Sequence, residues 1–362
     1  EVQDHDATSH ISTHARLTFN LMDELKLVLF GAYTYNIVEN SQYLPTSVWA
    51  HGQAYKGTKK MESLLGNMML TYKKGWKKHY FDALALAELQ KETYTGFYTT
   101  VTNFNTDKFG YHNLQAGALR PWEGTNSYYE QPHLASFMGR FNYTYADRYS
   151  LTMTARTDAS SKFGANHKWG FFPSVAGGWL VTNEKFMENA LSVLSKLKFR
   201  GSYGLVGNDQ LAGRRFAFLS TINSGNGFTY GLTGNQGIGG KFEGDFGVED
   251  LSWETVKKTD IGVEIGLWDC VNIQADYFHE KREDIFMQRK TIPETAGFNT
   301  NPWANFGIVK NQGFDASLEV NKSFGKDFFL SLRGNFTFSR NEIVEYDESE
   351  TMKQTTRART GN

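Results

Sequence analysis

The sequence predicts an all-β protein, an antiparallel sheet of long strands of the kind that closes into a transmembrane β-barrel. Several runs alternate polar and apolar residues with a period of two, and these runs are about ten residues or longer, as membrane-barrel strands are. Aromatic residues make up 15% of the 362 residues, with 35 glycines and only 6 prolines. Aromatics favour strands, and glycines suit sharp turns and close packing.

The first half of the chain predicts weaker strands near 16–37 and 61–90, followed by a clear hairpin. In this hairpin the runs 136–145 and 149–156 flank a turn at residues 146–148. Weaker strands follow near 170–182 and 196–206. Between them, Asn183 and the residues after it have the pattern of an N-cap and a short helix that reaches about Ser195. The favoured interpretation of this segment is a helical turn packed in a loop.

The second half predicts two further hairpins. Residues 260–267 and 271–277 alternate on either side of a turn at 268–270. Residues 314–321 and 330–339 do the same around a turn at 324–327. Cys270 falls in the first of these turns, which we predict to be periplasmic, and a structural thiol is the favoured interpretation of this residue.

The lengths of the connections favour a membrane barrel over a soluble β-sandwich. The three predicted turns are short, whereas residues 98–133 and 208–250 form long connections rich in Gly, Asn and Tyr. Outer-membrane barrels have short periplasmic turns and long extracellular loops. Both long connections are therefore predicted to be extracellular, and a sandwich-type lectin stays open as an alternative.

Composition and motifs exclude several classes of function. A net charge of −1 argues against a nucleic-acid partner, and a single cysteine excludes disulfides and cysteine-rich metal sites. The Gly-rich residues 231–244 lack the spacing of a phosphate-binding loop. His5, His10 and His14 lack the spacing of a metal site, and no catalytic motif occurs. We predict no catalytic residues, no metal, no cofactor and no enzymatic activity.

Ordered motifs resemble the SusC/RagA-type TonB-dependent transporters of the Bacteroidota outer membrane. The motifs in chain order are SFMGRFNYTYADRYSL (136–151), RTDASSKFG (156–164), WGFFPSVAGGWLVTNEKFM (169–187), LKFRGSYGLVGN (197–208), LSWETVKKTDIGVE (251–264) and NFGIVKNQGFDASLE (305–319). Ala159 stands where the family usually has Gly, and Lys162 where Arg is frequent.

The resemblance implies that residues 1–362 form an incomplete portion of a 22-stranded barrel. Members of that family carry a signal, a plug domain and a TonB box before the barrel, and we see none of these in this chain. The family implies active import of glycan oligomers or peptides across the outer membrane. Its implied partners are a SusD-like surface lipoprotein, TonB through the missing N-terminal region, outer-membrane lipid and the cargo. Two alternatives are a siderophore- or cobalamin-type receptor and a truncated barrel with only a structural role.

Two groups of residues are candidate contacts. Aromatic side chains in the long connections would contact cargo or the lipoprotein lid, or else pack within their own loops. They are Trp122, Tyr128, Tyr129, Phe228 and Tyr230. Three arginines on the polar faces of strands, Arg140, Arg156 and Arg200, are predicted to face the barrel lumen, with ordinary solvated sheet charges as the alternative.

Overall fold

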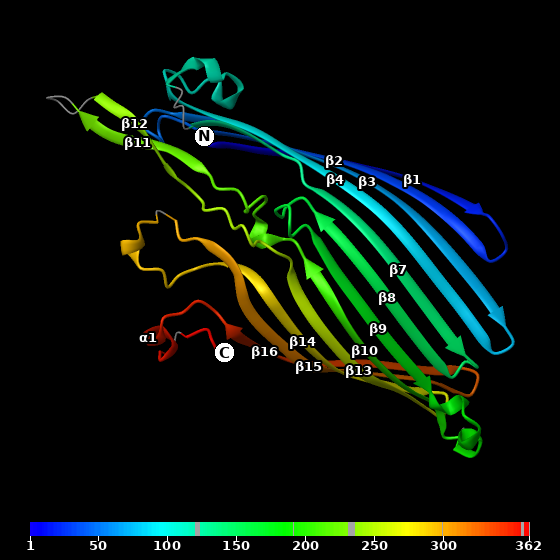
Figure 1. Cartoon of the computed structure of the whole chain (residues 1–362). Helices are drawn as coiled ribbons and strands as arrows, with labels where there is room; N and C mark the ends of the chain where they lie inside the picture. Colours follow the sequence, from blue (N-terminus) through cyan, green and yellow to red (C-terminus); the bar gives the residue numbers. More distant parts are fainter. Residues whose placement is uncertain (120–123, 191, 231–235, 299, 356–357, 362) are drawn as a thin grey trace. The chain divides into compact units, whose positions relative to one another are not determined.

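A computed structural model describes residues 1–119, 124–190, 192–230, 236–298, 300–355 and 358–361. The described residues are mostly β-strand (Figure 1). Two compact units are present: unit 1 comprises residues 1–21, 27–69 and 87–135, and unit 2 comprises residues 22–26, 70–86 and 136–362. None of the helices in the described ranges is both long and apolar enough to cross a membrane.

Unit 1 contains most of four long strands and two short ones. The long strands are β1 (Gln3–Asn20), β2 (Leu25–Leu44), β3 (Gln53–Trp76) and β4 (His79–Phe104), and they are neighbours in that order. Two short strands, β5 (Gly117–Leu119) and β6 (Thr125–Glu130), pair with β4. Short 3₁₀-helices η1 (Gly110–His112) and η2 (Leu114–Ala116) precede β5.

Unit 2 is a second antiparallel array. Its strands, in spatial order, are β7 (His133–Tyr145), β8 (Tyr149–Ser160), β9 (Trp169–Leu180), β10 (Leu194–Asn208), β13 (Glu254–Leu267), β14 (Val271–Gln288), β15 (Trp303–Phe324) and β16 (Phe328–Glu345). The hairpin of β11 (Ile222–Tyr230) and β12 (Gln236–Glu243) lies between β10 and β13 in the sequence but forms a separate two-stranded sheet, so β10 and β13 still pair directly. The short helices are η4 (Val181–Asn183), η5 (Lys185–Ala190), η6 (Leu211–Gly213), η7 (Glu294–Ala296) and α1 (Glu350–Lys353).

All three predicted hairpins are confirmed, and backbone conformation explains their turns. Ala146 and Asp147 have φ of 54°, and Trp268 and Asp269 have φ of 52° and 53°. Tight hairpins favour turns with positive φ because these match the right-handed twist of the strands. In the third turn Gly325, at φ 70°, supplies this conformation. The broad runs 16–37 and 61–90 each contain a further turn and divide into β1–β2 and β3–β4.

After Asn183 the favoured interpretation, a helical turn packed in a loop, is confirmed, and the longer helix to Ser195 does not form. Two 3₁₀-helices, η4 and η5, end at Ala190, and β10 begins at Leu194. The Asn183 side chain does not cap a helix, since its amide donates to the Asp147 carbonyl at 2.8 Å. Glu184 accepts hydrogen bonds from the Tyr149 hydroxyl and the Trp179 indole N–H. These contacts tie the segment to the β7–β8 turn and to the strands β8 and β9.

The two long connections contain strands of their own. Residues 98–133 include the end of β4 together with β5 and β6, and residues 208–250 include the β11–β12 hairpin. The sequence did not predict these strands, because glycines and polar residues occupy both of their faces and no polar–apolar alternation results. In β11–β12, for example, Gly225 is the register partner of Gly240.

The two faces of unit 2 have opposite characters. Large apolar side chains on one face are exposed, and examples are Phe141, Val175, Ile261, Tyr277, Phe314, Leu332, Phe336 and Phe338. Charged side chains of β10, β13 and β14 pair with one another on the other face. A soluble sheet buries its apolar face, whereas a barrel wall turns that face toward lipid and its polar face inward.

Aromatic residues mark two rims on the apolar face, ten residues apart. On β9 the rims are Trp169 and Trp179, and on β16 they are Phe328 and Phe338. Ten strand residues span roughly 33 Å, which a strand tilt of about 40° reduces to about 25 Å along the membrane normal. This height is the hydrocarbon thickness that outer-membrane barrels present.

The rims also run obliquely across the sheet. The cross-strand row through Trp179 passes Phe199, Val263, Ala275 and Ala316 and reaches Phe336 on β16. The rim residue of β16 is instead Phe328, eight residues nearer the turn. Five strand steps separate β9 from β16. A rise of roughly 26 Å over roughly 24 Å gives a strand tilt of about 45°, close to that of membrane barrels.

This geometry predicts that the cost of a charge depends on depth. Leu332 is 56% exposed and Phe338 is 60% exposed, but Leu332 lies between the rims and Phe338 on one of them. We expect Leu332→Arg to lower the free energy of unfolding by about 2–4 kcal/mol and Phe338→Arg by less than about 1 kcal/mol. Urea unfolding of the full-length protein in lipid vesicles measures both. Equal costs for the two variants would contradict the membrane band.

Candidate functional site: the polar face of unit 2

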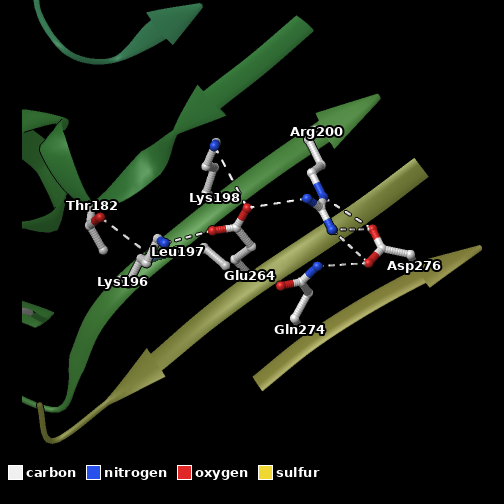
Figure 2. A network of polar contacts seen from close by, with 8 residues as sticks. All are labelled: Thr182, Lys196, Leu197, Lys198, Arg200, Glu264, Gln274 and Asp276. Atoms are coloured by element: carbon white, nitrogen blue, oxygen red, sulfur yellow. Dashed lines mark hydrogen bonds and ion pairs between the residues drawn. The ribbon is translucent and has the colours of Figure 1, made fainter. Parts of the chain in front are cut away.

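A salt bridge across β13 is the centre of the polar face. The Arg200 guanidinium of β10 donates from Nε and Nη2 to Oδ1 of Asp276 on β14, at 3.0 and 2.7 Å, and from Nη2 to Oδ2 at 2.6 Å (Figure 2). Gly262 is the register partner of both residues. A Cβ on Gly262 would overlap the Asp276 carboxylate and lie 2.7 Å from Nε of Arg200. Only glycine at this position leaves room for the bridge.

Glu264 extends this bridge into a network (Figure 2). Its carboxylate lies 2.6 Å from Nζ of Lys196, and 3.6 Å from both Nζ of Lys198 and Nη1 of Arg200. Gln274 donates to Oδ2 of Asp276 at 3.2 Å. The network holds charged side chains in fixed positions, so the face is polar without offering mobile charges.

One buried acceptor on this face is unsatisfied. Asp315 on β15 is the register partner of Asp276. Its Oδ1 is buried and has no hydrogen-bond partner among the described residues. Burying an acceptor without a partner costs about 1–3 kcal/mol. The neighbourhood of Asp276 and Asp315 is therefore suited to a hydrogen-bond donor or a cation.

The structure places the three candidate arginines differently. Arg200 is in the network, and Arg156 donates from Nε to both carboxylate oxygens of Asp158 at 2.9 Å and from Nη2 to Ser136 at 3.1 Å. Arg140 is exposed on β7. Asp158, Ser136 and Asp276 are partners that the sequence analysis did not assign as site residues. The RTDASS motif contained the signal for Asp158, because the two residues are two apart on one strand face.

The ordered motifs meet at the loop end of unit 2. Phe163 of the motif at 156–164 packs on Trp253 at a ring distance of 5.0 Å, and Phe172 of the motif at 169–187 packs on it at 5.3 Å. The Trp253 indole donates to the Lys168 carbonyl at 3.1 Å. Gly207 supplies the space for the Phe172 ring. The motifs thus form an aromatic cluster of Phe163, Phe172 and Trp253, which holds the strand ends where the loops begin.

Polar contacts surround this aromatic cluster. Asp209 accepts from the Ser160 hydroxyl at 2.9 Å and pairs with Nζ of Lys162 at 3.1 Å. The buried Glu254 accepts from the Asn208 amide at 2.8 Å and from the backbone N–H of Phe286 at 3.1 Å. The motif residues are occupied by one another, which indicates a structural role and not direct ligand contact.

The two candidate aromatics that the structure describes face opposite ways. Tyr128 and Tyr129 are consecutive residues of β6, so their rings point to opposite faces of that strand. Tyr129 is 65% exposed, and its hydroxyl accepts from Gln131 at 2.8 Å. Trp122 lies outside the described residues. Phe228 and Tyr230 belong to β11, but their side chains also lie outside what the structure describes.

A carboxylate clamp holds the end of the β4 connection in unit 1. Asp107 accepts from the Tyr43 hydroxyl at 2.8 Å, from the Thr46 backbone N–H at 3.0 Å and from the Thr46 hydroxyl at 2.9 Å. Beneath it, Tyr43 packs edge-on against Phe104 in a small buried cluster. The Thr46 N–H, followed by the Tyr43 hydroxyl, lowers the pKa of the Asp107 carboxyl.

A hollow of 590 Å³ lies among the strands β7 to β10. Its side-chain walls come mainly from Phe141, Met153, Val175 and Tyr203, which belong to the exposed apolar face. Ala155 and Pro173, which are register partners, are small residues at its edge. The hollow therefore belongs to the apolar face and is not a candidate passage for polar cargo.

Comparisons with known proteins agree with this geometry. The family profile described as "TonB dependent receptor-like, beta-barrel" matches residues 3–362. TonB-dependent receptor P3 of Formosa agariphila is 29% identical over 337 residues, which are 92% of this chain and 33% of that protein. TonB-dependent receptor SusC of Bacteroides thetaiotaomicron is 30% identical over 239 residues, which are 62% of this chain and 23% of that protein. The chain spans a third or less of the length of these relatives.

A solved structure shows the same fold. The RagAB peptide importer in its closed-closed state superposes with a TM-score of 0.81 at 22% identity, and covers 95% of this chain and 37% of that chain. The ferric-catecholate receptor Fiu from E. coli K12 gives a TM-score of 0.59 at 12% identity, with 94% and 48% covered. The strands therefore follow the RagAB fold more closely than the fold of this iron-chelate receptor.

The Arg200 bridge provides a test of the polar network. Asp276 has a side chain only 12% exposed, so Arg200→Gln leaves a nearly buried carboxylate unpaired. We expect this variant to lose about 1–2 kcal/mol of unfolding free energy, reduced from the value for a fully buried pair because a third of Arg200 is exposed. The control is Arg333→Gln, whose side chain is 74% exposed in its pair with Glu319 and should cost below about 1 kcal/mol. Indistinguishable urea-unfolding curves for the two variants would contradict this assignment.

The Asp107 clamp provides a pH test. Because the folded state lowers the pKa of Asp107, the clamp stabilises the fold above the ordinary carboxyl pKa of about 4, and this stabilisation is lost as the pH falls through the lowered value. We expect hydrogen-exchange protection of the Thr46 amide to decrease over that interval. Asp107→Asn, which cannot ionise, should show weak protection throughout. A variant with the pH profile of the unaltered protein would eliminate the clamp as the cause.

Proposed function

Because the chain belongs to the TonB-dependent receptor-like β-barrel family of outer-membrane receptors, we propose that it forms part of the barrel of an active importer. The proposed cargo is a glycan oligomer or a peptide, and TonB supplies the energy through a region outside this chain. The similarity to SusC and to the RagAB peptide importer supports this cargo class. The observation that carries the proposal is the pairing of an exposed apolar face with a salt-bridged polar face.

In this proposal the polar face of unit 2 lines the import path. A permeating oligomer needs a wall that hydrogen-bonds transiently but does not hold a charged group. The Arg200, Glu264 and Asp276 charges are already neutralised by one another at short distances. Their hydrogen-bonding capacity toward an uncharged sugar or peptide group remains, because each carboxylate oxygen accepts more than one hydrogen bond.

The remaining chain of the full protein would complete the site. We propose that a plug domain occupies the lumen and that its donors or cations contact the Asp276 and Asp315 region, where Asp315 Oδ1 is buried without a partner among the described residues. Further strands would pair with the outermost strands β1 and β16, because unpaired strand edges do not occur in lipid.

We propose a SusD-like lipoprotein as the lid at the loop end. Exposed aromatics are frequent anchors in protein interfaces, since a large ring is desolvated at a low entropy cost. Tyr129 is the described candidate with the largest exposed fraction. Tyr128 faces the opposite side of β6, where a Cβ on Gly96 would overlap its ring, so it packs on its own sheet.

Uptake tests the proposed function directly. A strain that lacks the gene, complemented with the full-length protein, is grown on oligosaccharides or on peptides as the limiting nutrient, with and without TonB. We expect growth on one of these cargo classes to require both the receptor and TonB. Growth restored only for an iron chelate or a cobalamin would overturn the cargo class, and no defect on any substrate would overturn import itself.

Lid association tests the loop contact separately. We expect Tyr129→Ala to weaken binding of the co-expressed lipoprotein by about 5- to 30-fold, the loss expected for an aromatic anchor worth roughly 1–2 kcal/mol. The control is Phe329→Ala, because Phe329 is 62% exposed but lies at the turn end of β16. Co-purification from mild detergent measures both variants, and equal recovery would remove Tyr129 from the interface.

A further inference from the structure

A row of lysines lies on the apolar face of unit 2, on the loop side of a row of aromatic side chains. Lys257 is the register partner of Lys281, and Lys281 is the register partner of Lys310. A parallel row of three aromatic register partners, Tyr277, Phe314 and Phe338, lies nearer the turns, and Phe338 is its member on the loop-end rim. On β14 and β15 the two rows are four positions apart, as from Tyr277 to Lys281. An even spacing keeps both rows on one face.

Between these rows lies a mixed row that adds a further cation. His279 is the register partner of Gln312, which is the partner of Arg340. Along β14 and β15 the apolar face thus changes from aliphatic to aromatic and then to cationic. Membrane proteins show this order where hydrocarbon gives way to lipid headgroups.

A hollow of 300 Å³ lies at the β15–β16 end of this cationic region. The residues around it are Lys310, Gln312, Arg340, Asn341, Glu342 and Gly361. Lys257 and Lys281 both pair with Glu283. Across the described ranges, the side chains of Lys310 and Arg340 have no ion-pair partner. The hollow therefore presents two cations whose charge the protein leaves available.

We propose that this hollow binds the phosphate of a membrane-lipid headgroup. The planar Arg340 guanidinium suits two phosphate oxygens, and the Lys310 ammonium adds a charge on a flexible stem that reaches the interface. A lipid bound there places its acyl chains along the face of Phe314 and Phe338. The inference rests on the outer-membrane location of the family and is independent of import and cargo.

The position of the hollow favours a lipid phosphate over free phosphate. A free anion would meet Lys310 and Arg340 in competition with water and with the neighbouring Glu342 carboxylate. A lipid brings its phosphate to this depth because its chains are held beside the rim. Each cation near a membrane surface contributes about 1 kcal/mol to binding an anionic headgroup.

A pair of lipids that differ only in the phosphate provides the test. The full-length receptor in mild detergent is titrated with phosphatidic acid or with the diacylglycerol of the same chains, and bound lipid is counted by native mass spectrometry. We expect phosphatidic acid to bind and diacylglycerol to bind at least tenfold more weakly. Equal binding of the two lipids would overturn the proposal. Inorganic phosphate that competes at the same concentrations as phosphatidic acid would overturn the lipid as its source.

Variants locate the site. Lys310→Gln with Arg340→Gln should weaken phosphatidic-acid binding about 30-fold, which corresponds to roughly 1 kcal/mol for each cation. The control, Lys322→Gln with Lys326→Gln, removes two cations at the turn end of the same hairpin and should leave this binding unchanged. Glu342→Gln should tighten binding, because it removes the carboxylate opposite Lys310. Loss of binding in the control pair, or none in the first pair, would contradict the assignment.

Discussion

A strand that lies in hydrocarbon must pair every backbone N–H and C=O with a neighbouring strand, because lipid offers no hydrogen bonds. This constraint explains why the strands of unit 2 are long and paired by continuous ladders, as in the 13 consecutive register pairs of β13 and β14. It also agrees with the positions of the described helices and long connections, which lie between strands. Each face then carries the side chains that suit its surroundings, with apolar groups on the lipid face and polar groups on the opposite face.

The polar face shows how a barrel wall carries charge without exposing it. Arg200 reaches over Gly262 to Asp276, and the missing side chain of that glycine is what makes a bridge between two non-adjacent strands possible. The result is a rigid surface rich in hydrogen-bonding groups. Such a surface agrees with a lining past which a polar oligomer moves, and it requires no conformational change of the wall.

Each unit has one set of contacts that anchors a connection between strands. In unit 2 the aromatic cluster of Phe163, Phe172 and Trp253 holds the strand ends. In unit 1 the Asp107 clamp holds the connection after β4. Both anchors are built from residues that contact one another. Specificity for cargo or for a lid is therefore expected from exposed residues beyond these anchors, such as Tyr129, and from the rest of the full protein.

The sequence by itself determined the three hairpins with their tight turns and the character of the two faces, because alternation and turn chemistry are local properties. It also indicated the family through its ordered motifs. Only the tertiary structure decided that β10 pairs with β13 across the β11–β12 excursion, and that Arg200 meets Asp276, 76 residues away. The oblique rims and the cationic hollow likewise depend on register between distant strands. Register arises from the summed pairing of whole strands, which no local pattern encodes.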